Sequence, residues 1–179
     1  QLVGAIIGQP DGRHILQPGT HSKWARVEER QIVWFATFMT GELFAVLKQH
    51  SILGRLMEGD GHDAEAFARG AHYGLAGDPS TGGLLARLFS ARTLPLLGDL
   101  PGTAVASYLS GLLLGTEVRE ALAALGDLAH DKVVLVGGAA LVTRYAAVLE
   151  QAGLVSVSAQ PDAAAYGHHL IAEAAGLLE

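Results

Sequence analysis

The hydrophobic pattern of this chain changes its period twice, and the order of these changes limits the folds that it can adopt. Residues 14–37 contain three β-rich segments joined by short turns, which is typical of antiparallel neighbours. Between residues 40 and 125 the apolar residues recur with the helical period. Strand, helix, strand and helix then follow from residue 132 onward. We therefore predict an α/β fold, with a mixed sheet (three antiparallel strands, then alternating helix and strand) and a helical insertion.

Several details of this prediction can be checked directly. Within the insertion, Pro101 is suited to the first turn of one helix, and the apolar stripe around Val118 predicts a separate, later helix. The strand aromatics are expected to be core residues rather than a base-stacking platform; they are Trp24, Trp34, Phe35 and Phe38. Residues 2–7 have the pattern of a further strand, and Asp162 is suited to cap the last helix.

Composition excludes several classes of protein. With 50% hydrophobic and 17% charged residues among 179, the chain is not disordered, and it contains no Cys for disulfides or thiolate chemistry. The net charge of −6, with scattered Lys and Arg, argues against a nucleic-acid partner. The apolar runs are shorter than the ~18 residues that span a membrane, and no signal peptide is visible, so we expect a cytoplasmic protein. The chain does not begin with Met, which suggests a piece of a longer protein.

The first candidate site is a turn between two predicted strands. It comprises Pro18, Gly19, Thr20, His21, Ser22 and Lys23. A glycine lets backbone N–H groups converge on a phosphate, two hydroxyls add donors, and the lysine adds positive charge. The first glycine and the following helix of a Walker A loop are missing. The alternative is a plain β-hairpin loop with an exposed lysine.

The second candidate site is the junction between a buried strand and a helix in VVLVGGAAL, residues 133–141. The missing side chains of Gly137 and Gly138 allow a flat ring or a phosphate to approach the main chain. The three-glycine spacing of a dinucleotide fingerprint is absent, which argues against NAD. The alternative is a tight turn that needs glycine only for its geometry.

Other residues favour no site of their own. The chain has no HExxH pair and no GxSxG elbow, and the neighbours His168 and His169 point about 100° apart on a helix, so we predict no metal cluster and no serine hydrolase. Glu42 is either catalytic or a helix-dipole partner in a first turn. Arg92 either contacts a ligand or closes a helix end.

Long stretches of the chain resemble one family. Residues 16–57, the LFSART motif at 88–93 and YLSGLLLGTE at 108–117 closely resemble 2-dehydro-3-deoxygalactonokinase, and the resemblance continues through residues 133–141 to the last helix. This family belongs to the sugar kinase, heat-shock and actin superfamily, whose members close two ribonuclease-H-like domains over ATP. The resemblance implies that residues 1–179 are the single C-terminal, nucleotide-binding domain, without the N-terminal domain.

The same resemblance implies roles for both candidate sites. The second phosphate-binding turn corresponds to Gly19 and Thr20 with the backbone of His21 and Ser22, and the adenosine motif corresponds to Gly137, Gly138 and Ala139, with Leu141 near the adenine. It also implies ATP and Mg²⁺ as cofactors. The first phosphate turn and the expected general base lie upstream of Gln1, and residues 2–7 become the tail of a helix.

The function implied by the resemblance is ATP-dependent phosphorylation of the 6-hydroxyl of 2-dehydro-3-deoxy-D-galactonate in galactonate breakdown. Such transfer depends on positioning and charge stabilisation rather than on a nucleophile. Two alternatives remain: a non-catalytic sugar-acid-binding or regulatory domain of the same fold, and a kinase for another sugar acid. The hydrophobic content leaves room for a homodimer, and the fragment alone is expected to be inactive.

Overall fold

The chain forms two compact units in the computed structural model, which describes residues 14–29, 31–77, 80, 82–126, 132–159 and 163–177. The sheet unit consists of Gln1–Phe38 and Asp127–Glu179, and the helical unit consists of Met39–Gly126. The helical unit is therefore inserted between the third and fourth strands, as the change of period predicts. The strand predicted at residues 2–7 and the cap predicted at Asp162 lie outside the described residues.

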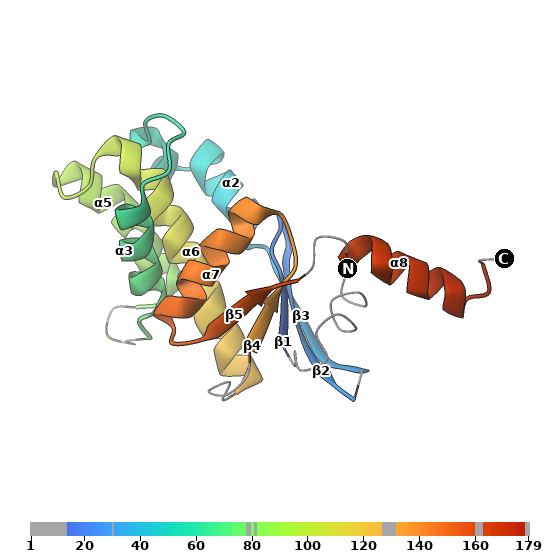
Figure 1. Cartoon of the computed structure of the whole chain (residues 1–179). Helices are drawn as coiled ribbons and strands as arrows, with labels where there is room; N and C mark the ends of the chain where they lie inside the picture. Colours follow the sequence, from blue (N-terminus) through green and yellow to red (C-terminus); the bar gives the residue numbers. More distant parts are fainter. Residues whose placement is uncertain are drawn as a thin grey trace. The chain divides into compact units, whose positions relative to one another are not determined.

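The sheet unit contains one mixed sheet with the strand order β3-β2-β1-β4-β5 (Figure 1). Its strands are β1 (His14–Gln17), β2 (Ser22–Glu28), β3 (Gln31–Phe38), β4 (Lys132–Leu135) and β5 (Val155–Ser158). The pairs β1–β2 and β2–β3 are antiparallel, whereas β1–β4 and β4–β5 are parallel. The predicted α/β class is confirmed, and the arrangement is that of a ribonuclease-H-like domain.

The two faces of this sheet bury different residues because side chains alternate along each strand. Ile15, Ala25 and Val134 belong to one buried apolar cluster, while Leu16 and its cross-strand partner Trp24 are fully buried on the other face. Phe35, however, is 49% exposed, so its predicted core position is wrong. Among the described strands, β3 lies at the edge of the sheet and pairs with β2 alone, so the sheet covers less of each of its side chains.

Two helices complete the described part of the sheet unit. These are α7 (Ala139–Gln151) and α8 (Ala163–Ala174). Helix α7 packs beside β5 and buries Tyr145, Val148 and Leu149 (Figure 1). It begins directly after the glycine pair at the end of β4, so the strand and the helix are joined by a short turn.

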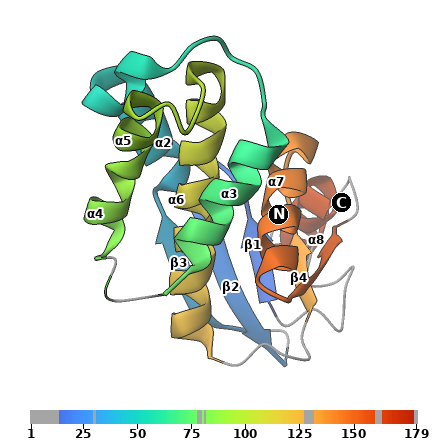
Figure 2. The ribbon, with the colours of Figure 1, turned by 90° about the vertical axis from the view of Figure 1, so that its left-hand side faces the viewer.

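The helical unit is built around a pair of packed helices, α3 and α6 (Figure 2). Its elements are α2 (Thr40–His50), η1 (Ile52–Leu56), α3 (Ala64–Leu75), α4 (Leu84–Leu88), α5 (Ser90–Leu96) and α6 (Gly102–Leu125). The prediction of two helices after Pro101 is wrong, because α6 is continuous through Gly115 and Val118. Buried residues of this unit form their own core, which includes Leu53, Leu88, Leu109 and Leu112.

Glycines allow the close approach of α3 and α6. A Cβ atom at Gly70 would collide with Tyr108 O and lie 2.9 Å from Leu112 N. On the facing helix, a Cβ atom at Gly111 would collide with Phe67 O and lie 2.8 Å from Ala71 N. The obstructing atoms belong to the backbone, so they cannot move aside as a flexible side chain would.

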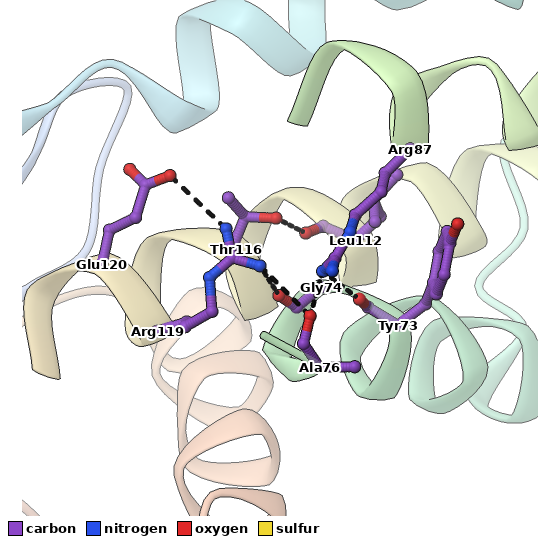
Figure 3. A network of polar contacts seen from close by, with 8 residues as sticks. All are labelled: Tyr73, Gly74, Ala76, Arg87, Leu112, Thr116, Arg119 and Glu120. Atoms are coloured by element: carbon purple, nitrogen blue, oxygen red, sulfur yellow. Dashed lines mark hydrogen bonds and ion pairs between the residues drawn. The ribbon is translucent and has the colours of Figure 1, made fainter. Parts of the chain in front are cut away.

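Two arginines bind the C-terminal end of α3 (Figure 3). Arg87 of α4 donates from Nη1 to Tyr73 O at 2.9 Å and to Ala76 O. Arg119 of α6 donates to Gly74 O at 2.9 Å and to Ala76 O at 3.3 Å. They satisfy carbonyls that the end of a helix leaves without intrahelical partners.

Across the part of the chain that the structure describes, no helix has the length and apolarity to cross a membrane.

Candidate nucleotide-binding edge of the sheet

The first predicted turn joins the end of β1 to the start of β2. Gln17 pairs with Lys23, so residues 18–21 extend beyond the last paired position of the hairpin. Thr20 and His21 are exposed, and the Lys23 ammonium donates to His21 O at 2.8 Å. This hydrogen bond holds the positive charge of Lys23 beside the backbone of the turn.

Ser22 differs from Thr20, the other hydroxyl residue of the first turn. Its side chain is fully buried, and its hydroxyl donates to Phe38 O across the β2–β3 pair at 3.4 Å. The hydroxyl therefore faces the neighbouring strand. Thr20 is the hydroxyl residue of the turn that is open to solvent.

The second predicted site joins β4 to α7. Gly138 is the N-cap of the helix, and its carbonyl accepts from Leu141 N at 3.1 Å and Val142 N at 3.0 Å. No side chain caps this end of the helix. The first N–H groups of a helix have no intrahelical carbonyl to bind, and the helix dipole places partial positive charge there. This junction therefore offers donors to a polar or anionic ligand.

The structure brings the two predicted turns together. Strands β1 and β4 are parallel neighbours, and Leu16 pairs with Leu135 at their carboxyl ends. Val136 N donates to Leu16 O at 3.0 Å, and a Cβ atom at Gly137 would lie 3.4 Å from Pro18 O. Segments more than a hundred residues apart in the sequence thus form one edge of the sheet, at the carboxyl ends where ligands of α/β sheets bind.

The glycines of this edge are not required by the fold. Gly138 has φ −67° and ψ 139°, a conformation open to any residue, and nothing lies within 4 Å of an added Cβ. At Gly19 the nearest atom to an added Cβ is His21 O at 3.7 Å, which is an ordinary contact. The turns can therefore form without glycine at these positions, and the missing side chains leave room in front of the backbone.

The composition of the edge suits a nucleotide. Backbone N–H groups, the Thr20 hydroxyl and the Lys23 ammonium can bind phosphate oxygens, and the missing side chains of Gly137 and Gly138 leave room for a ring beside the backbone. Among the residues that the structure describes, no group of three or more His, Asp or Glu side chains is arranged to hold a metal ion. A magnesium ion that accompanies a nucleotide is held largely by phosphate oxygens and water.

The remaining candidates lie elsewhere in the chain. Glu42 is in the first turn of α2, where a carboxylate is favourable to the helix dipole, and Arg92 lies within α5. Both belong to the helical unit. The side chains of His168 and His169 are exposed on α8.

Comparisons with known proteins show the family of the chain. A model of the 2-keto-3-deoxy-galactonokinase family matches residues 1–170. The chain belongs to this family. It is 38% identical over 155 residues to the 2-dehydro-3-deoxygalactonokinase of Escherichia coli K12, a match that covers 86% of this chain and 50% of the relative. A match of 38% identity over 159 residues, with the same coverage, links it to the "Probable 2-dehydro-3-deoxygalactonokinase DgoK1" of Rhizobium meliloti 1021.

Solved structures support the fold of this kinase-family chain. The crystal structure of a "putative 2-dehydro-3-deoxygalactonokinase protein" from Sinorhizobium meliloti is similar with a TM-score of 0.86 and 34% identity, over 99% of this chain and 59% of that one. Component A of the (R)-2-hydroxyglutaryl-CoA dehydratase of Acidaminococcus fermentans has a TM-score of 0.51 at 16% identity, covering 92% and 61%, and shows the fold alone. The chain spans about half the length of the curated relatives that it matches.

Sequence reasoning missed one part of the edge. Ala159 N donates to Leu135 O at 2.8 Å, so the end of β5 lies beside the end of β4. Strand β5 is parallel to β4 and has the same number of residues, so both strands reach the same edge. The equal length of the two strands is visible in the sequence, so the position of Ala159 beside the end of β4 could have been predicted.

Proposed function

We propose that the whole protein is an ATP-dependent kinase that phosphorylates the 6-hydroxyl of 2-dehydro-3-deoxy-D-galactonate in galactonate breakdown. Residues 1–179 form its nucleotide-binding domain. Family membership supports the reaction, and the adjacency of Pro18 and Gly137 at one sheet edge supports the nucleotide site. A phosphate turn and a ring-binding surface on neighbouring parallel strands can hold the two ends of one nucleotide.

The roles of the residues follow from their positions on the edge. The backbone at Gly19 and His21, with the Thr20 hydroxyl, binds the terminal phosphates, and Lys23 exchanges the carbonyl of His21 for a phosphate oxygen. Gly137, Gly138 and Ala139 lie along the adenosine, and Leu141 provides apolar contact with the adenine.

Positioning and charge account for the catalysis that such an edge can provide. ATP with Mg²⁺ supplies the transferable phosphoryl group and part of the charge neutralisation. Donors already in place bind the charge that develops on the transferring group without the cost of reorganising water.

The reaction is tested by measuring ADP formation by the whole protein. The assay uses ATP and Mg²⁺ with 2-dehydro-3-deoxygalactonate, its gluconate epimer and common hexoses. Preferential turnover of the galactonate compound supports the proposal. Turnover of a different sugar acid changes the substrate but keeps the kinase. Binding of nucleotide or sugar acid without any turnover overturns the kinase and supports a regulatory domain of this fold.

The adenosine site is tested separately with a matched pair of glycine substitutions. Gly138 and Gly83 are both helix N-caps with nothing within 4 Å of an added Cβ, and neither has a positive φ. Valine at either N-cap costs the fold a similar amount, about 1 kcal/mol. We expect Gly138→Val to raise the KM for ATP by about tenfold or more, because its methyl groups occupy the space meant for the ring, and Gly83→Val to leave the KM unchanged. Equal KM values for ATP in the two variants would show that Gly138 is not part of the nucleotide site.

A further inference from the structure

The end of α2 and the start of η1 enclose a polar pocket in the helical unit. Its volume is 460 Å³, which lies within the range of about 300–1,000 Å³ that is typical of small-molecule sites. Seven residues of one short segment line it: Lys48, Gln49, His50, Ser51, Ile52, Gly54 and Arg55. None of them belongs to the two turns of the nucleotide-binding edge, so the pocket is a candidate site of its own.

Contacts within the bend between α2 and η1 fix the shape of this pocket. The Ser51 hydroxyl donates to Leu47 O at 2.6 Å and accepts from Leu53 N at 3.1 Å, so it joins the last turn of α2 to the first turn of η1. A Cβ atom at Gly54 would collide with Lys48 O, so η1 packs directly on the end of α2. Leu53 belongs to the core cluster of the helical unit. The pocket therefore needs no ligand in order to form, which lowers the cost of binding one.

The pocket carries an excess of positive charge, although the net charge of the whole chain is −6. Lys48, His50 and Arg55 supply its basic side chains, and residues 43–57 include no Asp or Glu. The Lys48 ammonium donates to Asp60 Oδ1 at 2.8 Å, so its charge is already paired. Arg55 is exposed and makes no hydrogen bond or ion pair with any residue that the structure describes. Its guanidinium is the part of the pocket that is ready to bind an anion.

The dipole of α2 explains only part of this charge. Basic side chains in the last turn of a helix are favourable to its dipole, which accounts for Lys48 and His50. Arg55 belongs to η1 rather than to that turn. Its contribution to the pocket is therefore better explained by a ligand than by the stability of α2.

We propose that the α2–η1 pocket binds a small polyhydroxy organic anion. The Arg55 guanidinium is a planar fork that can bind two oxygens of a carboxylate or of a phosphate group. The Gln49 amide has donors and an acceptor for hydroxyl groups, and Ile52, which is 50% exposed, offers apolar contact to a carbon chain. An inorganic anion alone would leave most of the 460 Å³ unfilled, so the volume favours an organic one.

Calorimetric titration of the whole protein without nucleotide measures this binding. The probes are D-galactonate for a carboxylate, glycerol 3-phosphate for a phosphate monoester and galactitol as a neutral analogue, all at constant ionic strength. We expect one or both anions to bind and galactitol not to bind. Tighter binding of D-galactonate identifies the anionic group as a carboxylate, and tighter binding of glycerol 3-phosphate identifies it as a phosphate; either result supports the pocket.

Substitutions of Arg55 locate the binding in the pocket. Arg55→Gln should raise the Kd of the bound anion about tenfold or more, because the charged fork is lost. Arg55→Lys should recover only part of the affinity, since a lysine keeps the charge without the fork. The matched control is Arg69→Gln, which removes the same charge from an exposed arginine of α3 outside the pocket and should leave the Kd unchanged.

Three results would overturn the proposal. They are a wild-type protein that binds neither anion, an affinity that Arg55→Gln leaves unchanged, and an equal loss of affinity in the Arg55→Gln and Arg69→Gln variants, which would show an effect of net charge alone. Far-UV circular dichroism checks that every variant keeps its helices. Because the titration involves no phosphoryl transfer, its result does not depend on whether the protein is a kinase.

Discussion

The arginine pair at the end of α3 offers the sharpest test of what stabilises the helical unit. Arg87 is 1% exposed and donates to the carbonyls of Tyr73 and Ala76, while its guanidinium carbon lies 5.3 Å from the centroid of the Tyr73 ring (Figure 3). Arg87→Met keeps most of the apolar stem and removes both donors. The Tyr73 carbonyl then loses its charged partner, and the Ala76 carbonyl keeps only the longer hydrogen bond from Arg119.

The cost of this substitution can be worked out from its contacts. A hydrogen bond from a charged group contributes about 1.5–3 kcal/mol, and Arg87 makes two of them to backbone carbonyls. We expect Arg87→Met to lower the free energy of unfolding by about 3–5 kcal/mol. The side chain of Arg119 is 26% exposed, so water can replace its hydrogen bonds, and Arg119→Met should cost only about 1 kcal/mol.

Both arginines bind the carbonyl of Ala76, so the effects of the two substitutions on the free energy of unfolding should not be additive. A double-mutant cycle should give a coupling free energy of roughly 0.5–3 kcal/mol, as is found for residues that share a partner. Urea unfolding of the wild type, both single variants and the double variant, followed by far-UV circular dichroism, measures every corner of the cycle.

Arg87→Lys is the conservative control for the same site. A lysine keeps the charge but lacks the planar fork that reaches two carbonyls and lies over the Tyr73 ring, so most of the loss should remain. If Arg87→Met cost less than about 1 kcal/mol, or the two singles were strictly additive, the shared-carbonyl account would be wrong.

Three further predictions test packing, ionisation and the proposed phosphate turn. Gly111→Ala should lower the free energy of unfolding by roughly 1–3 kcal/mol in urea, despite the better helix propensity of alanine, because its Cβ meets Phe67 O; an increase would contradict the packing. Burial raises the pKa of Tyr108, so its stabilising contribution is complete below the unfolded pKa of about 10 and is lost as the pH rises through the folded pKa. Tyr108→Phe should therefore flatten the alkaline fall in urea midpoint, and an unchanged slope would refute this. Thr20→Ala in the whole enzyme should lower kcat about 10²-fold with little change in the KM for ATP, and unchanged steady-state kinetics would remove Thr20 from phosphate binding.

The three antiparallel strands and both turns could be predicted because their signals are local. Short turns after residues 17 and 28 require antiparallel neighbours, and the buried strand at 132–135 is followed at once by two glycines. The parallel pairing of β1 with β4 was not visible in any one segment. It follows from the topology, and it alone places Pro18 beside Gly137.

The errors come from contacts that no local pattern contains. Gly115 resembles a helix breaker, yet a Cβ there would collide with Ala71 O of the neighbouring helix, so the glycine serves packing inside a continuous α6. Phe35 has the pattern of a core strand residue, but the strand order places it at an edge of the sheet. Both outcomes depend on how segments that are distant in the sequence are arranged, which a local pattern does not contain.

The glycines show why the candidate site could not be interpreted from the sequence alone. At Gly70 and Gly111 an added Cβ meets the backbone of a neighbouring helix, so the absence of a side chain is already used by the fold. At Gly138 an added Cβ meets nothing within 4 Å and the backbone conformation is ordinary, so neither close packing nor an unusual φ requires the glycine, although glycine is a favourable N-cap residue. The alternative of a turn that needs glycine only for its geometry therefore fails at this position. The proposed nucleotide would use the space that the missing side chain leaves, and the donors of the helix N-terminus and of the neighbouring turn at residues 18–21 would bind its polar groups.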